Sequence, residues 1–315
     1  MPQSVSSTAV LSAARSLIGI LGAAATRPLF LLLAIVSFAF GVTEAGSQDA
    51  DRGAYVAKAA GCISCHTDFK GEGSPYAGGR PLKTPFGVFY SPNITPDPET
   101  GIGAWSDADF VRALRDGVSP QGKHYFPVFP YTSYTRLTGR DILDLKAFLF
   151  SLEPVRLDVP AHDVPFPFNV RFAQFFWKQL FFTSGTEALD PAQTDEWNRG
   201  RYLVRAAAHC GECHTPRNFV GGSRESMFLA GTTDGPEGER APNITPDGGT
   251  GVGTWSTDDL VNLMKTAFKP DFDNVQGSMA EAIEHGLKDL TDADHKAIAV
   301  YLKAIPAIVN NVPRR

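Results

Sequence analysis

The sequence predicts an all-α protein built from two tandem copies of one domain with long loops, and three observations lead to this prediction. Separated segments of the first copy return in the same order in the second. Both copies carry amphipathic helix patterns, and the loops between them are rich in Gly and Pro. The recurring segments are Gly53–Cys62 with Gly200–Cys210, Pro92–Asp97 with Pro242–Asp247, and Thr100–Ser106 with Thr250–Ser256. A shared order over three separated segments indicates a duplication.

The first two helices of each copy follow from local patterns. The first runs into a cysteine, since Tyr55, Ala59 and Cys62 share one helical face. The second begins at a serine that is followed three residues later by aspartate, a capping box with Asp in place of Glu. These pairs are Ser106 with Asp109 and Ser256 with Asp259. In the first copy we expect this helix to end near Gly117.

The last helix of each copy is predicted after a threonine. In the first copy it follows Thr138, and in the second it follows Thr291. Apolar residues lie on one face of each helix. These residues are Ile142, Leu145, Leu149 and Leu152 in the first copy, and Ile298, Tyr301, Leu302 and Ile305 in the second.

The repeat sets the domain boundaries. Residues 48–153 form the first predicted domain and 193–306 the second, with 154–192 as a linker and 307–315 as a tail. The linker is Pro-rich at first and then aromatic, from Phe172 to Phe182. Two interpretations stay open. The linker packs across both domains, which its few cations favour, or it offers a surface to a membrane or a partner subunit.

Residues 1–45 have the pattern of an export signal. Arg15 and Arg27 are the only charges before Glu44, and Pro28–Val42 is an uncharged, apolar run. This run is shorter than the roughly 20 residues of a membrane span, which favours a cleaved signal peptide over an uncleaved N-terminal anchor. In either case the rest of the chain leaves the cytoplasm. The sequence therefore predicts a periplasmic protein, either free or attached to the inner membrane.

The charge balance limits the class of partner. The chain of 315 residues has a formal net charge of −5 at pH 7. An acidic protein has no electrostatic basis for binding nucleic acid, so we expect none. A protein partner with a basic docking patch suits it better.

The four cysteines lie in two Cys-x-x-Cys-His motifs. The first comprises Cys62, Cys65 and His66, and the second Cys210, Cys213 and His214. This is the attachment pattern for c-type haem, in which two thiols form thioethers with the vinyl groups and the histidine ligates iron. A dithiol, a disulfide or half of a zinc site are the alternatives. Both copies carry the histidine behind an export signal, so the sequence predicts two covalently bound haems c in two class I cytochrome c-like domains.

The distal ligand of the second haem is predicted to be Met279. Its position before the final helix of the second copy is where a distal sulfur enters if the last helices close over the haem. A His214/Met279 pair raises the reduction potential and suits electron transfer. Met264 lies among apolar helix residues and is expected in the core, whereas Met227 is the weaker rival.

The first haem has no methionine partner, because no methionine follows Met1 in the first copy. His124 and His162 are the candidate distal nitrogens, and Lys123 is a more distant one. An open sixth position is the alternative, and it would allow the binding of small ligands. The repeated Asn-Ile-Thr-Pro-Asp loops also allow two interpretations: they border the haem propionates, or they are turns fixed by proline.

At these repeated motifs the sequence resembles the multihaem cytochrome c subunits of periplasmic alcohol, sugar acid and related dehydrogenases, and their stand-alone dihaem relatives. The resemblance covers about residues 50–306. It implies His66, His214 and Met279 as iron ligands. Members of the dehydrogenase type commonly carry three such domains, and this chain has two. Where that family has a distal methionine before Pro-Tyr, this chain has Phe129.

The sequence thus predicts a carrier that takes electrons from a periplasmic dehydrogenase and passes them to a downstream cytochrome or oxidase. Whether it is an enzyme stays open, although an electron-transfer protein or subunit is favoured. The alternative is a dihaem oxidoreductase or peroxidase acting at the first haem. The missing methionine favours this alternative, and the absence of an acid–base cluster in the sequence does not.

Overall fold

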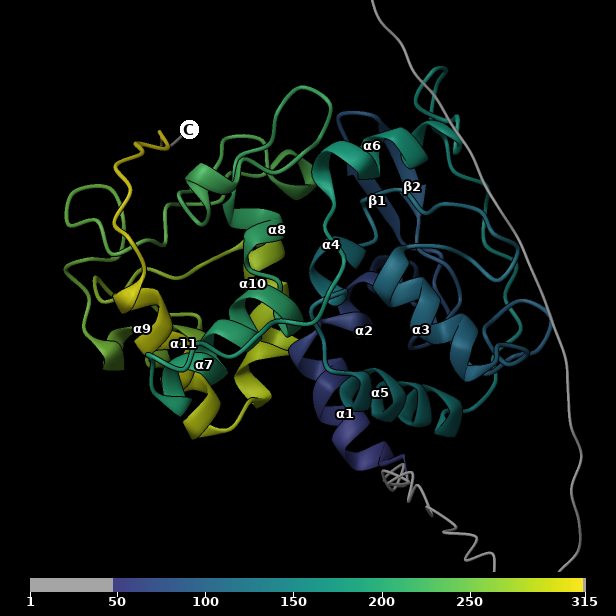
Figure 1. The fold of residues 1–315 in the computed structure, drawn as a ribbon, viewed down its shortest axis with the longest axis horizontal. Helices are drawn as coiled ribbons and strands as arrows, with labels where there is room; N and C mark the ends of the chain where they lie inside the picture. Colours follow the sequence, from purple (N-terminus) through teal and green to yellow (C-terminus); the bar gives the residue numbers. More distant parts are fainter. Residues whose placement is uncertain (1–47, 314–315) are drawn as a thin grey trace, which may run out of the picture. The chain divides into compact units, whose positions relative to one another are not determined.

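The structure, a computed structural model, describes residues 48–313 and is mostly helical (Figure 1). The predicted export segment, residues 1–45, lies outside the described residues. Within 48–313, no helix is long and apolar enough to cross a membrane. We call residues 48–153 the first half and residues 193–306 the second half.

The first half is drawn from purple to teal in Figure 1 and contains five helices among the described residues, a short 3₁₀ turn and one hairpin. The elements are α1 (Ala50–Ala59), α2 (Cys62–Cys65), η1 (Phe69–Gly71), β1 (Pro81–Thr84), β2 (Gly87–Tyr90), α3 (Asp107–Asp116), α4 (Tyr131–Tyr134) and α5 (Gly139–Ser151).

Helix α6 (Ala173–Phe181) lies in the linker. The second half follows, in green and yellow, with the same order of major helices. Its elements are α7 (Asp195–Tyr202), η2 (Leu203–Ala207), α8 (Gly211–His214), η3 (Glu225–Met227), η4 (Pro236–Gly238), α9 (Thr257–Thr266), α10 (Gly277–Glu284), η5 (Leu287–Asp289) and α11 (Asp292–Ala304).

The predicted helix starts at Ser106, Ser256, Thr138 and Thr291 are confirmed. Both capping boxes form: the serine side chain accepts from the aspartate backbone N–H, and the aspartate side chain accepts from the serine backbone N–H. Helix α3 ends at Gly117, whose φ of 60° is left-handed and suits glycine. Thr138 and Thr291 cap α5 and α11 with their side chains. The prediction that the first helix runs into its cysteine is wrong: α1 ends at Ala59, and Cys62 begins the separate turn α2 because Gly61 between them takes a left-handed φ of 60°.

The hairpin β1–β2 was not expected from the sequence. Its strands pair antiparallel, with Leu82 opposite Phe89. A linker residue extends this pairing, since Val88 and Asp163 exchange two backbone hydrogen bonds of 2.8 and 2.9 Å. Because each strand has four residues, the alternation of side chains is too short to give a clear strand pattern.

The segment from the repeated glycine to the first motif cysteine is one residue longer in the second half, Gly200–Cys210, than in the first, Gly53–Cys62. The extra residue is absorbed in a π-helical turn, η2, that continues α7. His209 then takes a positive φ of 38°, as Gly61 does with 60° before Cys62. The cysteine is thereby presented in the same way in both halves.

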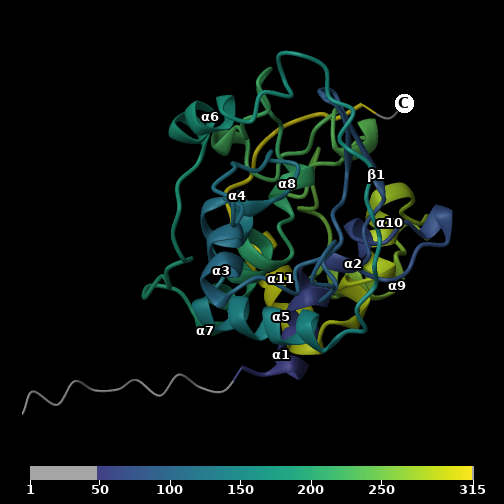
Figure 2. The same cartoon turned by 90° about the vertical axis from the view of Figure 1, so that its right-hand side faces the viewer.

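In each half the first helix packs closely against the last. Helices α1 and α5 lie side by side in both views (Figures 1 and 2), and α7 packs against α11. A Cβ atom at Gly53 would overlap the carbonyl oxygen of Asp144, and one at Gly200 would overlap that of Ala297. Glycine at these two equivalent positions therefore permits the close approach of the helix backbones.

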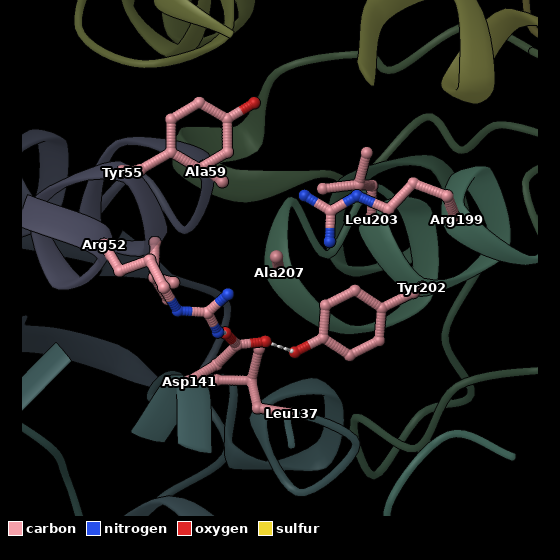
Figure 3. A pocket seen from close by; sticks show the side chains of 10 residues that line it. Arg52, Tyr55, Ala59, Leu137, Asp141, Arg199, Tyr202, Leu203 and Ala207 are labelled. Atoms are coloured by element: carbon pink, nitrogen blue, oxygen red, sulfur yellow. Dashed lines mark hydrogen bonds and ion pairs between the residues drawn. The ribbon is translucent and has the colours of Figure 1, made fainter. Parts of the chain in front are cut away.

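Two equivalent tyrosines join the halves reciprocally. Tyr55 on α1 donates to the carboxylate of Asp294 on α11, at 2.5 Å, and accepts from the backbone N–H of Thr291. Tyr202 on α7 donates to Asp141 on α5 (Figure 3) and accepts from the backbone N–H of Thr138. Each tyrosine thus binds the start of the last helix of the other half.

An arginine from the same half completes each of these contacts. Arg52 pairs with Asp141, and Arg199 pairs with Asp294 at 2.6 Å. Burial by itself would raise the pKa of Asp294, but hydrogen bonds from Arg199 and Tyr55 hold it below the ordinary value. Side chains of α1 and α7 face one another across the small cavity that this arrangement surrounds (Figure 3).

The linker helix α6 contacts both halves but leaves aromatic side chains exposed. The Nζ atom of Lys178, whose residue is 5% exposed, donates to the carbonyl oxygens of Asp116 and Gly117. Trp177 donates to the carbonyl oxygen of Val220 in the second half, at 2.9 Å. Exposed apolar residues of this region are Phe166, Phe168, Phe172, Phe175, Phe176 and Leu180. The linker therefore packs on both halves, and that its exposed aromatic side chains meet a membrane or a partner subunit stays a prediction.

We expect Tyr55→Phe to lower the free energy of unfolding by about 1–2 kcal/mol, because it removes a hydrogen bond to a partly buried carboxylate. Urea unfolding followed by far-UV circular dichroism measures this. Tyr90→Phe is the matched control, since the Tyr90 hydroxyl has no hydrogen bond among the described residues. Equal stability of the two variants would show that the reciprocal tyrosines do not hold the halves together.

Candidate haem-binding site

Each Cys-x-x-Cys-His motif forms a single helical turn. The first comprises α2 with His66 directly after it, and the second lies at α8 with Cys210 directly before it. None of the four cysteines forms a disulfide. Burial raises the pKa of Cys62 and Cys210 to about 12, so both side chains are neutral thiols at pH 7.

The motif histidines are oriented in the same way by a backbone carbonyl. Nδ1 of His66 lies 2.7 Å from the carbonyl oxygen of Pro92, and Nδ1 of His214 lies 2.8 Å from that of Pro242. A carbonyl only accepts, so Nδ1 carries the proton and donates. Burial lowers the pKa of both histidines, which keeps the rings neutral. The Nε2 lone pair of each ring is therefore available to a metal.

Pro92 and Pro242 directly precede the repeated Asn-Ile-Thr-Pro-Asp segments, so these loops position the carbonyl oxygens that accept from His66 and His214. In the first loop Asn93 is 2% exposed and makes four hydrogen bonds. Its Nδ2 donates to Thr100 and to the carbonyl oxygen of Val155, and its Oδ1 accepts twice from Thr95. The turn interpretation is thus supported, with the addition that the turn places a carbonyl under the histidine.

The second loop repeats this network with the same distances. Nδ2 of Asn243 donates to Thr250 at 3.0 Å and to the carbonyl oxygen of Ile308 at 2.7 Å. Its Oδ1 accepts from the backbone N–H and the hydroxyl of Thr245. Sequence reasoning did not assign the carbonyls of Pro92 and Pro242 to the histidines. The signal was present, since the loops recur unchanged beside the recurring motifs.

The alternatives to haem fit the motifs poorly. Across residues 48–313, no group of three or more His, Cys, Asp or Glu side chains is placed to hold a metal ion. Two neutral thiols and one neutral imidazole with a free Nε2 are the donor set that covalent c-type haem requires. The residues present therefore fit this group.

Met279 lies in the first turn of α10, not in the loop where the sequence had placed it. It is partly exposed, whereas Met264 is 6% exposed and belongs to the main hydrophobic core, as expected. Met227 lies in the short turn η3. Met279 is thus a methionine that the core does not engage, which is compatible with a ligand.

The two candidate distal histidines of the first haem are held by other contacts. Nδ1 of His124 lies 3.1 Å from Nζ of Lys178, and its ring packs on Phe175. Nδ1 of His162 accepts from the backbone N–H of Tyr90 at 3.2 Å. The structure gives neither histidine a hydrogen bond or ring contact with the first motif.

His209 joins the two halves next to both motifs. Its Nε2 lies 3.2 Å from the carbonyl oxygen of Ala60, and its ring packs edge-on against Tyr134. The hydroxyl of Tyr134 donates to the same carbonyl at 2.9 Å. His209, which directly precedes Cys210 of the second motif, thus contacts Ala60, two positions before Cys62 of the first motif.

Helices α4 and α10 each reach the motif of the other half, α4 directly and α10 through Arg80. Arg80 in the first half donates to the carbonyl oxygen of Ser64 and pairs with Glu281 on α10. In the second motif Glu212 accepts from the hydroxyls of Thr132 and Ser133 on α4, at 2.7 and 2.8 Å. Side chains of one half therefore contact the other half beside both motifs, and we call this arrangement the crossing of the halves.

The crossing brings the motifs near one another. Burial above all, with the charge of Glu212, raises the pKa of Cys213 to about 12, and Cys65 of the first motif adds to this rise.

We expect Asn93→Ala to lower the free energy of unfolding by about 2–3 kcal/mol, because it leaves the buried backbone N–H of Thr95 without its acceptor and removes the shorter of two hydrogen bonds to the carbonyl oxygen of Val155. Asn243→Ala should have the same effect in the second half. Thermal and urea unfolding measure both. Asn169→Ala, an exposed residue of the linker, is the control and should change stability by less than about 0.5 kcal/mol. If Asn93→Ala behaves like this control, the loop does not position the histidine.

Comparison with known proteins identifies the family. No protein-family model matches the chain. The fructose dehydrogenase cytochrome subunit of Gluconobacter japonicus is 44% identical over 81% of this chain, which spans about half (52%) of that relative. The alcohol dehydrogenase (quinone) cytochrome c subunit of Gluconobacter oxydans is 39% identical over 88% of this chain and 59% of its own length. The "Diheme cytochrome c-type" protein of Cereibacter sphaeroides is 45% identical over 82% of this chain and 87% of its own length. The chain therefore belongs to the family of dihaem c-type cytochromes and cytochrome c subunits of dehydrogenases.

Proposed function

We propose that the chain is an exported cytochrome with two covalently bound haems c, and that it carries electrons from a periplasmic dehydrogenase to a downstream cytochrome or oxidase. The observation that carries this proposal is the duplicated geometry of the motifs. In both halves a neutral histidine donates from Nδ1 to a loop carbonyl and leaves Nε2 free, beside two unpaired thiols. Residues 48–153 and 193–306 would each enclose one haem.

Each side chain of the motif has a separate task. The thiols of Cys62 and Cys65, and of Cys210 and Cys213, would hold the haems as thioethers. The bound haem supplies reversible one-electron chemistry at its iron. Hydrogen bonding at Nδ1 fixes the ring orientation and increases the basicity of Nε2. Met279 would complete the second site with a thioether sulfur, which favours a higher reduction potential.

A partner is suggested by the relatives, whose names describe them as cytochrome subunits of fructose, alcohol and gluconate dehydrogenases. An electron donor of this class, oxidising a sugar, a sugar acid or an alcohol, suits the chain. The chain spans 52% of the fructose dehydrogenase subunit and 59% of the alcohol dehydrogenase subunit. The export pattern of residues 1–45 supports a periplasmic location, free or at the inner membrane.

An anaerobic redox titration with absorption spectra tests the proposal. The full chain should accept two electrons reversibly, in one or two steps with c-type spectra. Cys210→Ala/Cys213→Ala and Cys62→Ala/Cys65→Ala should each accept one, because each removes one attachment site. His285→Gln is the control, since this ring stacks on Phe69 away from the motif contacts. Uptake of one electron or none by the native chain would contradict the proposal.

Electron transfer is distinguished from the alternative enzyme by adding hydrogen peroxide to the reduced protein. A carrier should be reoxidised by peroxide without sustained turnover. Steady consumption of peroxide with a reduced donor, lost in Cys62→Ala/Cys65→Ala, would favour a peroxidase acting at the first haem.

A further inference from the structure

The backbone shows that Phe129 and Met279 occupy equivalent positions in the two halves. Each lies after a turn closed by an isolated bridge, Val118 with His124 in the first half and Phe268 with Asn274 in the second. The chain then returns to the preceding helix: the N–H of Tyr125 donates to Gly117 at 2.8 Å, and that of Val275 donates to Ala267 at 2.9 Å. Four residues further on are Phe129 and Met279. The same short stretch of chain leads to α4 in one half and α10 in the other.

Phe129 lies on the side of the first half that carries the attachment motif. Its ring packs edge-on against Tyr125, with centroids 5.5 Å apart, and against Tyr134 at 5.8 Å. Tyr134 in turn donates to the carbonyl oxygen of Ala60, two residues before Cys62. Cys62 and Phe129 also pack against the same hydrophobic core. A phenyl ring therefore occupies the position in the first half that the thioether of Met279 occupies in the second.

The other candidate ligands of the first haem have contacts elsewhere in the described residues. Residues 48–153 contain no methionine. The ring of His124 packs on Phe175 of the linker helix α6, and its Nδ1 lies near Lys178 of the same helix, so its contacts are with the linker and not with the first motif. His162 packs on Phe89 and Phe126, which form a second hydrophobic cluster separate from the core that includes Cys62. Lys123 is exposed on the turn.

We infer that the first haem, held by Cys62, Cys65 and His66, has no protein ligand on its distal side, and that Phe129 makes this side a binding site for a small neutral ligand such as carbon monoxide or nitric oxide. This inference rests on the proposed function, since it needs haem at the first motif. A neutral diatomic molecule suits the site because the aromatic rings around Phe129 would not stabilise a desolvated anion. The second haem, with Met279, is closed to such ligands and remains the electron carrier.

Binding at the first haem would have a consequence for electron transfer. A ligand that prefers ferrous iron stabilises the reduced state and so raises the reduction potential of that haem. Two contacts between the halves lie beside the motifs, one between Arg80 and Glu281 and one between Thr132 and Glu212. The first haem would then retain its electron and stop exchanging it with the second.

Titration of the dithionite-reduced full chain with carbon monoxide tests the inference. The native protein should show one high-spin and one low-spin ferrous haem and should bind one carbon monoxide per chain. Phe129→Met should bind none and show a second sulfur–iron absorption band in the ferric state. The reciprocal Met279→Phe should bind two. Met264→Leu, a substitution in the core, is the control and should keep the native value of one.

The haem content of each sample separates this inference from the proposed function. Native protein with two haems that are both low-spin and bind no carbon monoxide would overturn the inference and leave the proposed function standing. Fewer than two haems would contradict the function itself. Cys62→Ala/Cys65→Ala makes the test independent of whether Phe129→Met folds. This variant keeps the second haem, and it should bind no carbon monoxide if the first haem is the open one.

Discussion

The hydrogen bond from the motif histidine to a loop carbonyl is the interaction on which the rest of the site depends. It fixes which nitrogen of His66 and His214 is protonated, and therefore which one faces a metal. A carbonyl can do this only if its loop is rigid. The buried side chains of Asn93 and Asn243 provide that rigidity with identical sets of hydrogen bonds. The Gly- and Pro-rich loops are thus part of the binding site and more than connections between helices.

The second constraint is the crossing of the halves. Tyr55 and Tyr202 each bind the first turn of the last helix in the opposite half, so the two copies cannot separate without exposing polar partners. The same crossing recurs at the motifs through Glu281 and Glu212. Burial alone would raise the pKa of Glu212, but Arg217 and the hydroxyls of α4 hold it below the ordinary value, so it stays ionised. These contacts hold the two halves together and place their motifs next to each other.

The sequence was sufficient for features that local chemistry determines. The capping boxes at Ser106 and Ser256 form because their residues are three positions apart, and the motifs contain all their donors within five residues. It was not sufficient for contacts between distant residues. The Tyr55–Asp294 hydrogen bond joins residues 239 positions apart, and no periodicity predicts it. Likewise, His124 and His162 were candidates by residue type, and only the fold shows that Lys178 and Tyr90 meet them.

The central claim is that each half presents one motif that holds haem covalently. Mass spectrometry of the exported protein, intact and after proteolysis, tests it most directly. We expect a mass increase of two haems, with one haem on the peptide containing Cys62 and Cys65 and one on the peptide containing Cys210 and Cys213. A protein with one haem or none, or with a disulfide within either motif, would contradict the account.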